Sequence, residues 1–224
     1  MILKENSALN RYQWAAKKIA GITGQLSTSG VTLFDIGARD NVLKQYLPQT
    51  TLDYKAFDLY PLNEAAQQWD IENTFPYQHP APQIITMLEV IEHLKNPWLC
   101  MKNVAETMAP GGYLILTTPN PAWSNSRVNL LNKGYLSCFT QSDLELNHHV
   151  FTAWPHIVNR LLADTGFEIT EYSTLDGQTH IFDKNLKGLS IPLKLISRIT
   201  KKIIELKDPA ACGMSYGIIA KRIA

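Results

Sequence analysis

Residues Val31 to Asp40 read V-T-L-F-D-I-G-A-R-D, an apolar run followed by an acid, a glycine and polar residues. A run of this length bounded by turn signals is typical of a buried parallel strand, although periodicity alone also allows a helix segment. Gly37 tolerates the positive φ of a tight strand-to-helix turn and lets a ligand approach the backbone. Asp35 then lies at the edge where open α/β sheets bind their ligands. The stretch predicts the start of a nucleotide-binding unit.

Strand and helix patterns alternate along the rest of the chain. Apolar runs predict further strands at 53–59, 69–71, 83–88, 113–118, 167–174 and 214–221. Apolar residues at helical spacing predict helices over 1–26, 42–47, 98–108, 153–165 and 191–206. Alternation of this kind predicts an α/β fold with a mostly parallel sheet and helices on both faces.

Composition narrows the class of protein. The chain has 224 residues, which suits one domain with appendages, and its net charge of +1 gives no electrostatic argument for a nucleic-acid partner. Three widely spaced cysteines argue against a disulfide framework and indicate a reducing compartment. No apolar run approaches the roughly 18 residues of a membrane span. Since the N-terminus also lacks the apolar core of a signal peptide, we expect a cytoplasmic protein.

Two further acids follow predicted strands. Asp58 lies 21 positions beyond Gly37, the spacing at which a second-strand acid accepts hydrogen bonds from ribose hydroxyls. A turn aspartate before Tyr60 is the structural alternative. Asp70 ends the weak third strand at the same rim.

A third group of candidate site residues follows the strand at 83–88. If a helix begins there, Glu89, Glu92 and His93 share one helical face.

The ordered set of motifs resembles the class I S-adenosylmethionine-dependent methyltransferases over roughly residues 30–175. The set comprises D-I-G, Asp58, Asp70-Ile71, E-V-I-E-H-L and P-G-G-Y-L-I-L-T-T-P, and a final Y-G-I-I-A-K strand also fits. The resemblance implies a Rossmann-like, seven-stranded sheet with an antiparallel last strand. We therefore expect a helical cap at 1–29 and a methyltransferase domain at 30–224. That domain includes a substrate-side insertion at 122–150 and a basic amphipathic helix at 187–207.

The resemblance also implies positions for S-adenosyl-L-methionine. Asp35, Gly37, Ala38 and Arg39 would line its methionine and ribose end. Asp58 would take the ribose hydroxyls with Leu59 beside the adenine, and Asp70 would meet the adenine amino group with Ile71 on the ring. Leu88 and Glu89 would lie next to the sulfonium and the methyl acceptor.

One position departs from the family pattern. Glycines usually stand two and four places after the first glycine, where this chain has Arg39 and Asn41. Arg39 either pairs with the cofactor's carboxylate or occludes the pocket. If Arg39 pairs with the carboxylate, the chain is expected to be a methyltransferase. If Arg39 occludes the pocket, the chain is expected to be a non-catalytic protein of the same fold that serves a binding partner. A nicotinamide-dependent oxidoreductase is a further alternative, but Arg39 interrupts its G-x-G-x-x-G motif.

Transfer to a hydroxyl requires removal of its proton, by a base or by a metal that lowers its pKa. His93, beside Glu89, is the candidate base. The E-x-x-E-H triplet also resembles that of ubiquinone-pathway and small-RNA O-methyltransferases, which implies a Mg²⁺ or Mn²⁺ site at Glu89, Glu92, His93 and His149. The alternative is that the acid caps a helix and the histidine packs.

The expected reaction is O-methylation of a small-molecule or glycan- or lipid-linked acceptor, because residues 120–136 resemble the corresponding segment of methyltransferases that act on such hydroxyls. The sequence also has no dense basic patch of the kind that RNA binding requires. The helix at 191–206 either docks on its own domain with its lysines in water, the commoner arrangement, or lies on an anionic membrane surface.

Overall fold

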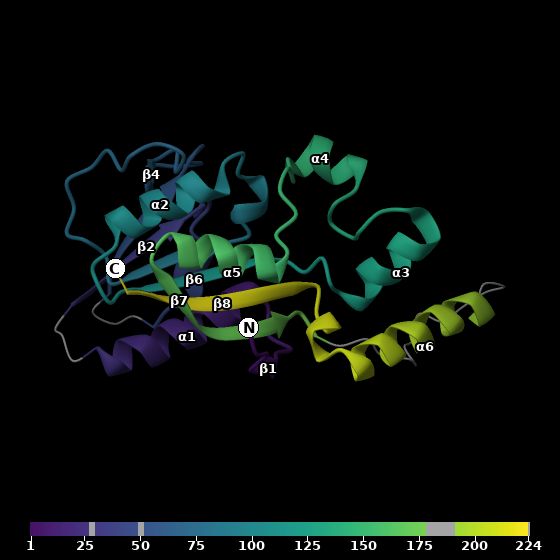
Figure 1. Cartoon of the computed structure of the whole chain (residues 1–224). Helices are drawn as coiled ribbons and strands as arrows, with labels where there is room; N and C mark the ends of the chain where they lie inside the picture. The colour runs from purple at the N-terminus through teal and green to yellow at the C-terminus, as the bar shows by residue number, and fades with distance from the viewer. Residues whose placement is uncertain (27–29, 49–51, 178–190, 224) are drawn as a thin grey trace.

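Residues Val31–Ile36 form β2, a fully buried strand inside an eight-stranded sheet of order β1-β7-β8-β6-β5-β2-β3-β4. The computed structural model describes residues 1–26, 30–48, 52–177 and 191–223 (Figure 1). The end of the predicted N-terminal cap and residues 187–190 of the predicted basic segment lie outside this description.

Apart from β1, which was not predicted, and β4, which lies before the predicted 69–71, the remaining strands agree with the predicted alternation. They are β1 (Glu5–Asn6), β3 (Leu52–Asp58), β4 (Ala66–Gln68), β5 (Ile84–Leu88), β6 (Tyr113–Pro119), β7 (Phe167–Leu175) and β8 (Ser215–Arg222). The helices are α1 (Arg11–Gln25), α2 (Pro97–Thr107), α3 (Ser124–Lys133), α4 (Gln141–Asn147), α5 (Pro155–Asp164) and α6 (Ile191–Lys207). Short 3-10 turns are found at Leu43–Tyr46, Ile91–His93 and Pro209–Ala211.

Strand directions confirm the predicted α/β, Rossmann-like sheet with helices on both faces. Neighbouring strands run parallel except β8, which is antiparallel to β6 and β7. The predicted count of seven strands is short by one, because β1 adds a two-residue strand beside β7.

The N-terminal segment corrects a second prediction. The helix expected over 1–26 begins only at Arg11, because the side chain of Asn10 accepts from the backbone N–H of Gln13 and caps the helix there. Residues before the cap extend along β7 instead, where Lys4 N donates to Tyr172 O and Ser7 N donates to Thr174 O.

Two apolar layers cover the sheet. On one face α1 buries Trp14 and Ile19 against Leu33 and its neighbours. On the other face α2 and α5 cover Phe34 and its neighbours. Adjacent residues of β2 therefore serve opposite layers, as the pleat requires. Gly217 of β8 leaves room for Trp14, since a Cβ there would lie 2.6 Å from the indole ring.

Helix α6 lies beside α3, away from the sheet (Figure 1). One contact between the two helices is polar: Ser124 Oγ of α3 donates to the buried Glu205 carboxylate of α6 at 2.8 Å. The sequence favoured docking through the apolar side of this helix. Within the described residues, none of the helices has the length and apolar character to cross a membrane.

Candidate functional site

A cleft of about 960 Å³ opens at the carboxyl ends of β2, β3 and β5. The parallel register brings these ends to one edge of the sheet, where a doubly wound fold binds its ligands. Every predicted site residue lines this cleft: Asp35, Gly37, Ala38, Arg39, Asp58, Leu59, Asp70, Ile71, Leu88, Glu89, Glu92, His93 and His149.

The turn after β2 has the conformation of a glycine-rich loop. Gly37 has φ 76° and Val90 packs over it, so that a Cβ would lie 2.4 Å from Val90 Cγ2. Arg39 and Asn41 also have positive φ, at 39° and 59°. The two residues that replace glycines therefore keep the left-handed backbone. Asn tolerates this conformation well, whereas Arg adopts it at a cost on the order of 1–2 kcal/mol.

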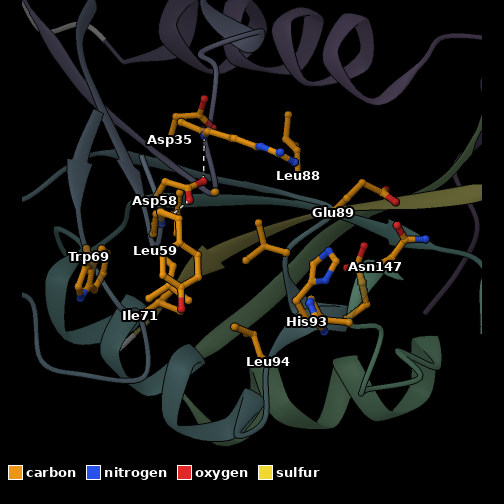
Figure 2. A pocket seen from close by; sticks show the side chains of 18 of the residues that line it. Asp35, Asp58, Leu59, Trp69, Ile71, Leu88, Glu89, His93, Leu94 and Asn147 are labelled. Carbon is orange, nitrogen blue, oxygen red and sulfur yellow. Dashed lines mark hydrogen bonds between the residues drawn. The ribbon is translucent and has the colours of Figure 1, made fainter. Parts of the chain in front are cut away.

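Asp58 joins this turn to the end of β3. Its Oδ2 accepts from the backbone N–H of Arg39 at 2.9 Å and its Oδ1 accepts from that of Tyr60 at 2.8 Å. A carboxylate oxygen can accept two hydrogen bonds, so each oxygen of Asp58 retains capacity for a ligand hydroxyl. Figure 2 shows Asp58 and Leu59 on the same side of the pocket as Trp69 and Ile71.

Asp35 differs from Asp58, because both of its oxygens are engaged inside the sheet. Tyr54 donates to Oδ2 at 2.6 Å and Thr86 donates to Oδ1 at 2.7 Å, which links β3 and β5 through β2. Burial raises the pKa of Asp35 to about 6, although both hydroxyls favour the carboxylate. Asp35 therefore shapes the floor of the cleft.

Asp70 forms a turn at the rim. It accepts from the backbone N–H of Glu72 at 3.0 Å and from the Asn73 amide at 2.8 Å. The side chains on both sides of it, Trp69 and Ile71, are buried and contribute apolar wall. Sequence reasoning used Ile71 and missed Trp69, although an aromatic residue directly before a rim acid was the available signal.

Glu89 lies at the opposite end of the cleft, and Figure 2 shows it with His93 and Asn147 there. Its φ of 58° ends β5, so the helical turn begins only at Ile91. The expectation that Glu89, Glu92 and His93 share a helical face is therefore wrong. Burial raises the pKa of Glu89 to about 7, while the Arg11 guanidinium acts in the opposite direction.

Glu92, His93 and His149 do meet. One potential ligand atom from each lies within 4.8 Å of the others, and Glu89 is outside this group. Glu92 is fully buried: Thr118 donates to its Oε2 at 2.9 Å, and Oε1 has no hydrogen-bond partner within the described residues. Burial and the nearby Glu89 carboxylate raise the pKa of Glu92 well above its ordinary value.

The two histidine rings of the group are in contact, with centroids 4.9 Å apart. His149 Nδ1 donates to the Cys138 carbonyl at 2.6 Å, which leaves Nε2 as the ring nitrogen that faces the group. Burial and the neighbouring His149 lower the pKa of His93, so its imidazole is neutral near pH 7.

Several lining residues were not predicted. Arg11 and Tyr12 reach the cleft from the first turn of α1, and Leu94, Asn147 and His148 complete the end near His93. The sequence predicted a helical cap over residues 1–29 without assigning any of its residues to the site. In the structure, Trp14 packs while Arg11 and Tyr12 face the cleft.

A doubly wound sheet with a cleft at the carboxyl ends of its strands is the architecture in which many α/β proteins bind nucleotides or nucleosides. Comparison with known families makes this specific: the family described as methyltransferase domain matches residues 10–172. This match covers most of the chain. The chain therefore belongs to the methyltransferase-domain family, within the class I S-adenosylmethionine-dependent methyltransferases.

Individual relatives are distant. Ubiquinone biosynthesis O-methyltransferases from Psychrobacter cryohalolentis and Psychrobacter arcticus are each 24% identical over 114 residues, covering 44% of this chain and 44% of the relative. The chain thus matches less than half the length of these curated relatives.

Solved structures share the fold over nearly the whole chain. The SAM-dependent methyltransferase from Archaeoglobus fulgidus matches with a TM-score of 0.58 at 14% identity. The match covers 93% of this chain and 94% of the Archaeoglobus chain. The plantazolicin methyltransferase BamL, solved with a triazolic desmethylPZN analog and SAH, has a TM-score of 0.58 at 12% identity, covering 96% of this chain and 85% of its own.

Proposed function

We propose that this chain transfers the methyl group of S-adenosyl-L-methionine to a hydroxyl of a small-molecule or glycan- or lipid-linked acceptor. The observation that carries the proposal is the division of one cleft into two ends. Asp58, Leu59 and Ile71 suit the adenosine, and Glu89, His93 and His149 suit an acceptor hydroxyl. The O-methyltransferase relatives support the choice of oxygen.

The adenosine end supplies binding and orientation. Asp58 accepts the ribose hydroxyls while it keeps its two backbone donors, and Leu59 and Ile71 contact the adenine. Asp70 receives the adenine amino group. The backbone N–H groups of Gly37, Ala38 and Arg39 already donate to Phe57 O and to Asp58, so this turn meets the methionine portion through its carbonyls. The guanidinium of Arg39 pairs with the methionine carboxylate.

Methyl transfer from a sulfonium is an in-line displacement, so alignment supplies much of the catalysis. Leu88 lies next to the sulfonium and Glu89 lies at the acceptor end, so that together they position the methyl group and the acceptor. His93 accepts the hydroxyl proton as the oxygen attacks the methyl carbon, and S-adenosylhomocysteine leaves. The lowered pKa of His93 suits this role, because the neutral imidazole is the form that accepts a proton.

A second arrangement has one specific observation in its favour. Within the described part of the chain, the buried Glu92 Oε1 has no hydrogen-bond partner and His149 keeps Nε2 available, which fits a divalent ion held by Glu92, His93 and His149. Mg²⁺ or Mn²⁺ there would lower the pKa of the acceptor hydroxyl. Glu89 would lie beside this site as a neighbouring charge.

Radiolabelled methyl transfer to a panel of phenolic and sugar hydroxyls tests the proposal. Replacement of the base in His93→Gln should lower kcat by about 10²–10⁴-fold. The affinity for S-adenosylhomocysteine should be unchanged, because His93 lies at the acceptor end. Wild-type activity should fall as the pH drops through the lowered pKa of His93.

The surface variant Asp53→Asn, on β3 outside the cleft, is the matched control. Full activity of His93→Gln would remove His93 from the chemistry. Mn²⁺ titration followed by its electron paramagnetic resonance signal, with Glu92→Gln as the comparison, decides between the base and the metal arrangement.

A further inference from the structure

Helix α6 displays an apolar stripe to solvent. Its four exposed members are spaced three, four and three residues apart and share one side of the helix. They are Ile196 (61% exposed), Ile199 (42%), Ile203 (48%) and Leu206 (74%). The stripe is about 15 Å long at 1.5 Å per residue. Exposure of adjacent large apolar side chains on one face indicates an interaction surface.

The opposite side of α6 contacts helix α3. Glu205 is buried and accepts from Ser124 of α3, with Lys202 Nζ 3.7 Å from its other oxygen. At the end of the helix Arg127 of α3 pairs with Asp208. Among the described residues, these polar contacts join the opposite side of α6 and its end to α3 and leave the four exposed apolar side chains facing outward.

The charge on α6 identifies the partner chemistry. The helix carries five basic side chains and one acidic one, and the acid is the buried Glu205. At 100° per residue Lys202 and Lys207 border the stripe on its two sides. Lys201 has two cations, Arg198 and Lys133, and the buried Glu205 carboxylate as neighbouring charges. A second copy of this chain would bring the same positive charges against themselves, whereas an anionic surface attracts them.

We propose that α6 docks on an anionic membrane surface, with the stripe from Ile196 to Leu206 inserted at the level of the headgroups and its lysines on the phosphates. A basic amphipathic helix binds membranes in this orientation, through apolar burial plus attraction to anionic lipids. The inference rests on α6 and α3 and does not depend on which acceptor the cleft methylates.

Co-sedimentation with lipid vesicles tests this surface. The protein should bind vesicles of phosphatidylglycerol with phosphatidylcholine, and bind pure phosphatidylcholine at least tenfold more weakly. The double variant Ile199→Gln with Ile203→Gln leaves the charge unchanged, so its expected loss of tenfold or more in the partition coefficient measures apolar insertion. The matched control is Ile2→Gln with Ile223→Gln, two exposed isoleucines outside α6, which should bind like the wild type.

Equal vesicle binding by the α6 variant and the wild type would overturn the proposal, as would absence of wild-type binding to the anionic vesicles. Light scattering on the same samples should give a monomer. A wild-type dimer that the α6 variant dissociates would make the stripe a contact between copies instead. S-adenosylhomocysteine binding by all variants confirms that the cleft is intact and separates this test from that of methyl transfer.

Discussion

At the scale of single residues, the cleft depends on backbone conformations that side chains usually disfavour. Gly37, Arg39 and Asn41 all have positive φ within five residues, and Glu89 adopts the same conformation at the end of β5. Strain of this kind concentrates at functional sites. Positive φ is thus found at Arg39 and Asn41, although only the first glycine of the family pattern is present.

Gly37→Ala should lower the free energy of unfolding by at least about 2 kcal/mol, because it adds the cost of positive φ to an overlap with Val90. Gly134→Ala is the matched control: it has φ 80° and open space around its Cβ, so it should cost only about 1 kcal/mol. Adding Val90→Ala to Gly37→Ala should recover part of the loss. Equal effects of the two glycine substitutions in urea unfolding would show that Val90 does not constrain the turn.

Asp35 should give the protein a measurable pH dependence. Its carboxyl titrates near 3.8 when unfolded and at about 6 when folded, so the folded state binds the extra proton between these values. Its contribution to stability is complete below pH 4 and is lost as the pH rises through 6. The difference in unfolding free energy between wild type and Asp35→Asn should therefore change by about 2–3 kcal/mol between pH 4 and pH 8. A pH-independent difference would mean that folding does not change the pKa of Asp35.

At the scale of elements, the strands and helices around the cleft could be predicted because their apolar patterns are long. The two elements that were misjudged are short and depend on distant partners. β1 has two residues and exists only because β7 offers backbone partners. In the E-V-I-E-H-L segment, Glu89, Glu92 and His93 have the spacing of one helical face. In the structure Glu89 instead follows a strand with positive φ, and the buried Glu92 accepts a hydrogen bond from Thr118.

Glu171 of β7 should hold two N-terminal elements in place. It is nearly buried and pairs with Lys4 next to β1 at 2.8 Å and with Lys18 of α1 at 2.5 Å. Glu171→Gln should cost about 1–3 kcal/mol in urea unfolding, since both ammonium groups lose a charged acceptor. Asp53→Asn, which breaks the more exposed Lys55 pair at 3.0 Å, should cost less than about 1 kcal/mol. Similar costs would show that the Glu171 pairs act as ordinary surface contacts.

At the scale of the whole molecule, parallel strands bring residues far apart in the sequence to one edge. The spacing of Gly37 and Asp58 and the acid at Asp70 predicted a common rim, and all predicted site residues line one cleft. The approach of His149 to His93 followed from resemblance alone, because it depends on the path of residues 122–150. The outward apolar side of α6 could not be predicted, since only the contact with Ser124 reveals which side is buried.

The cleft should bind the nucleoside part of the cofactor through Asp58, and the side chain of Arg39 should leave the pocket open. Titration calorimetry with S-adenosylhomocysteine tests it most directly. We predict binding by the wild type and by Asp53→Asn, and a loss of tenfold or more in Asp58→Asn, which retains one acceptor oxygen for the turn. A folded wild type that binds no S-adenosylhomocysteine would contradict the account and make this a methyltransferase fold with a closed pocket.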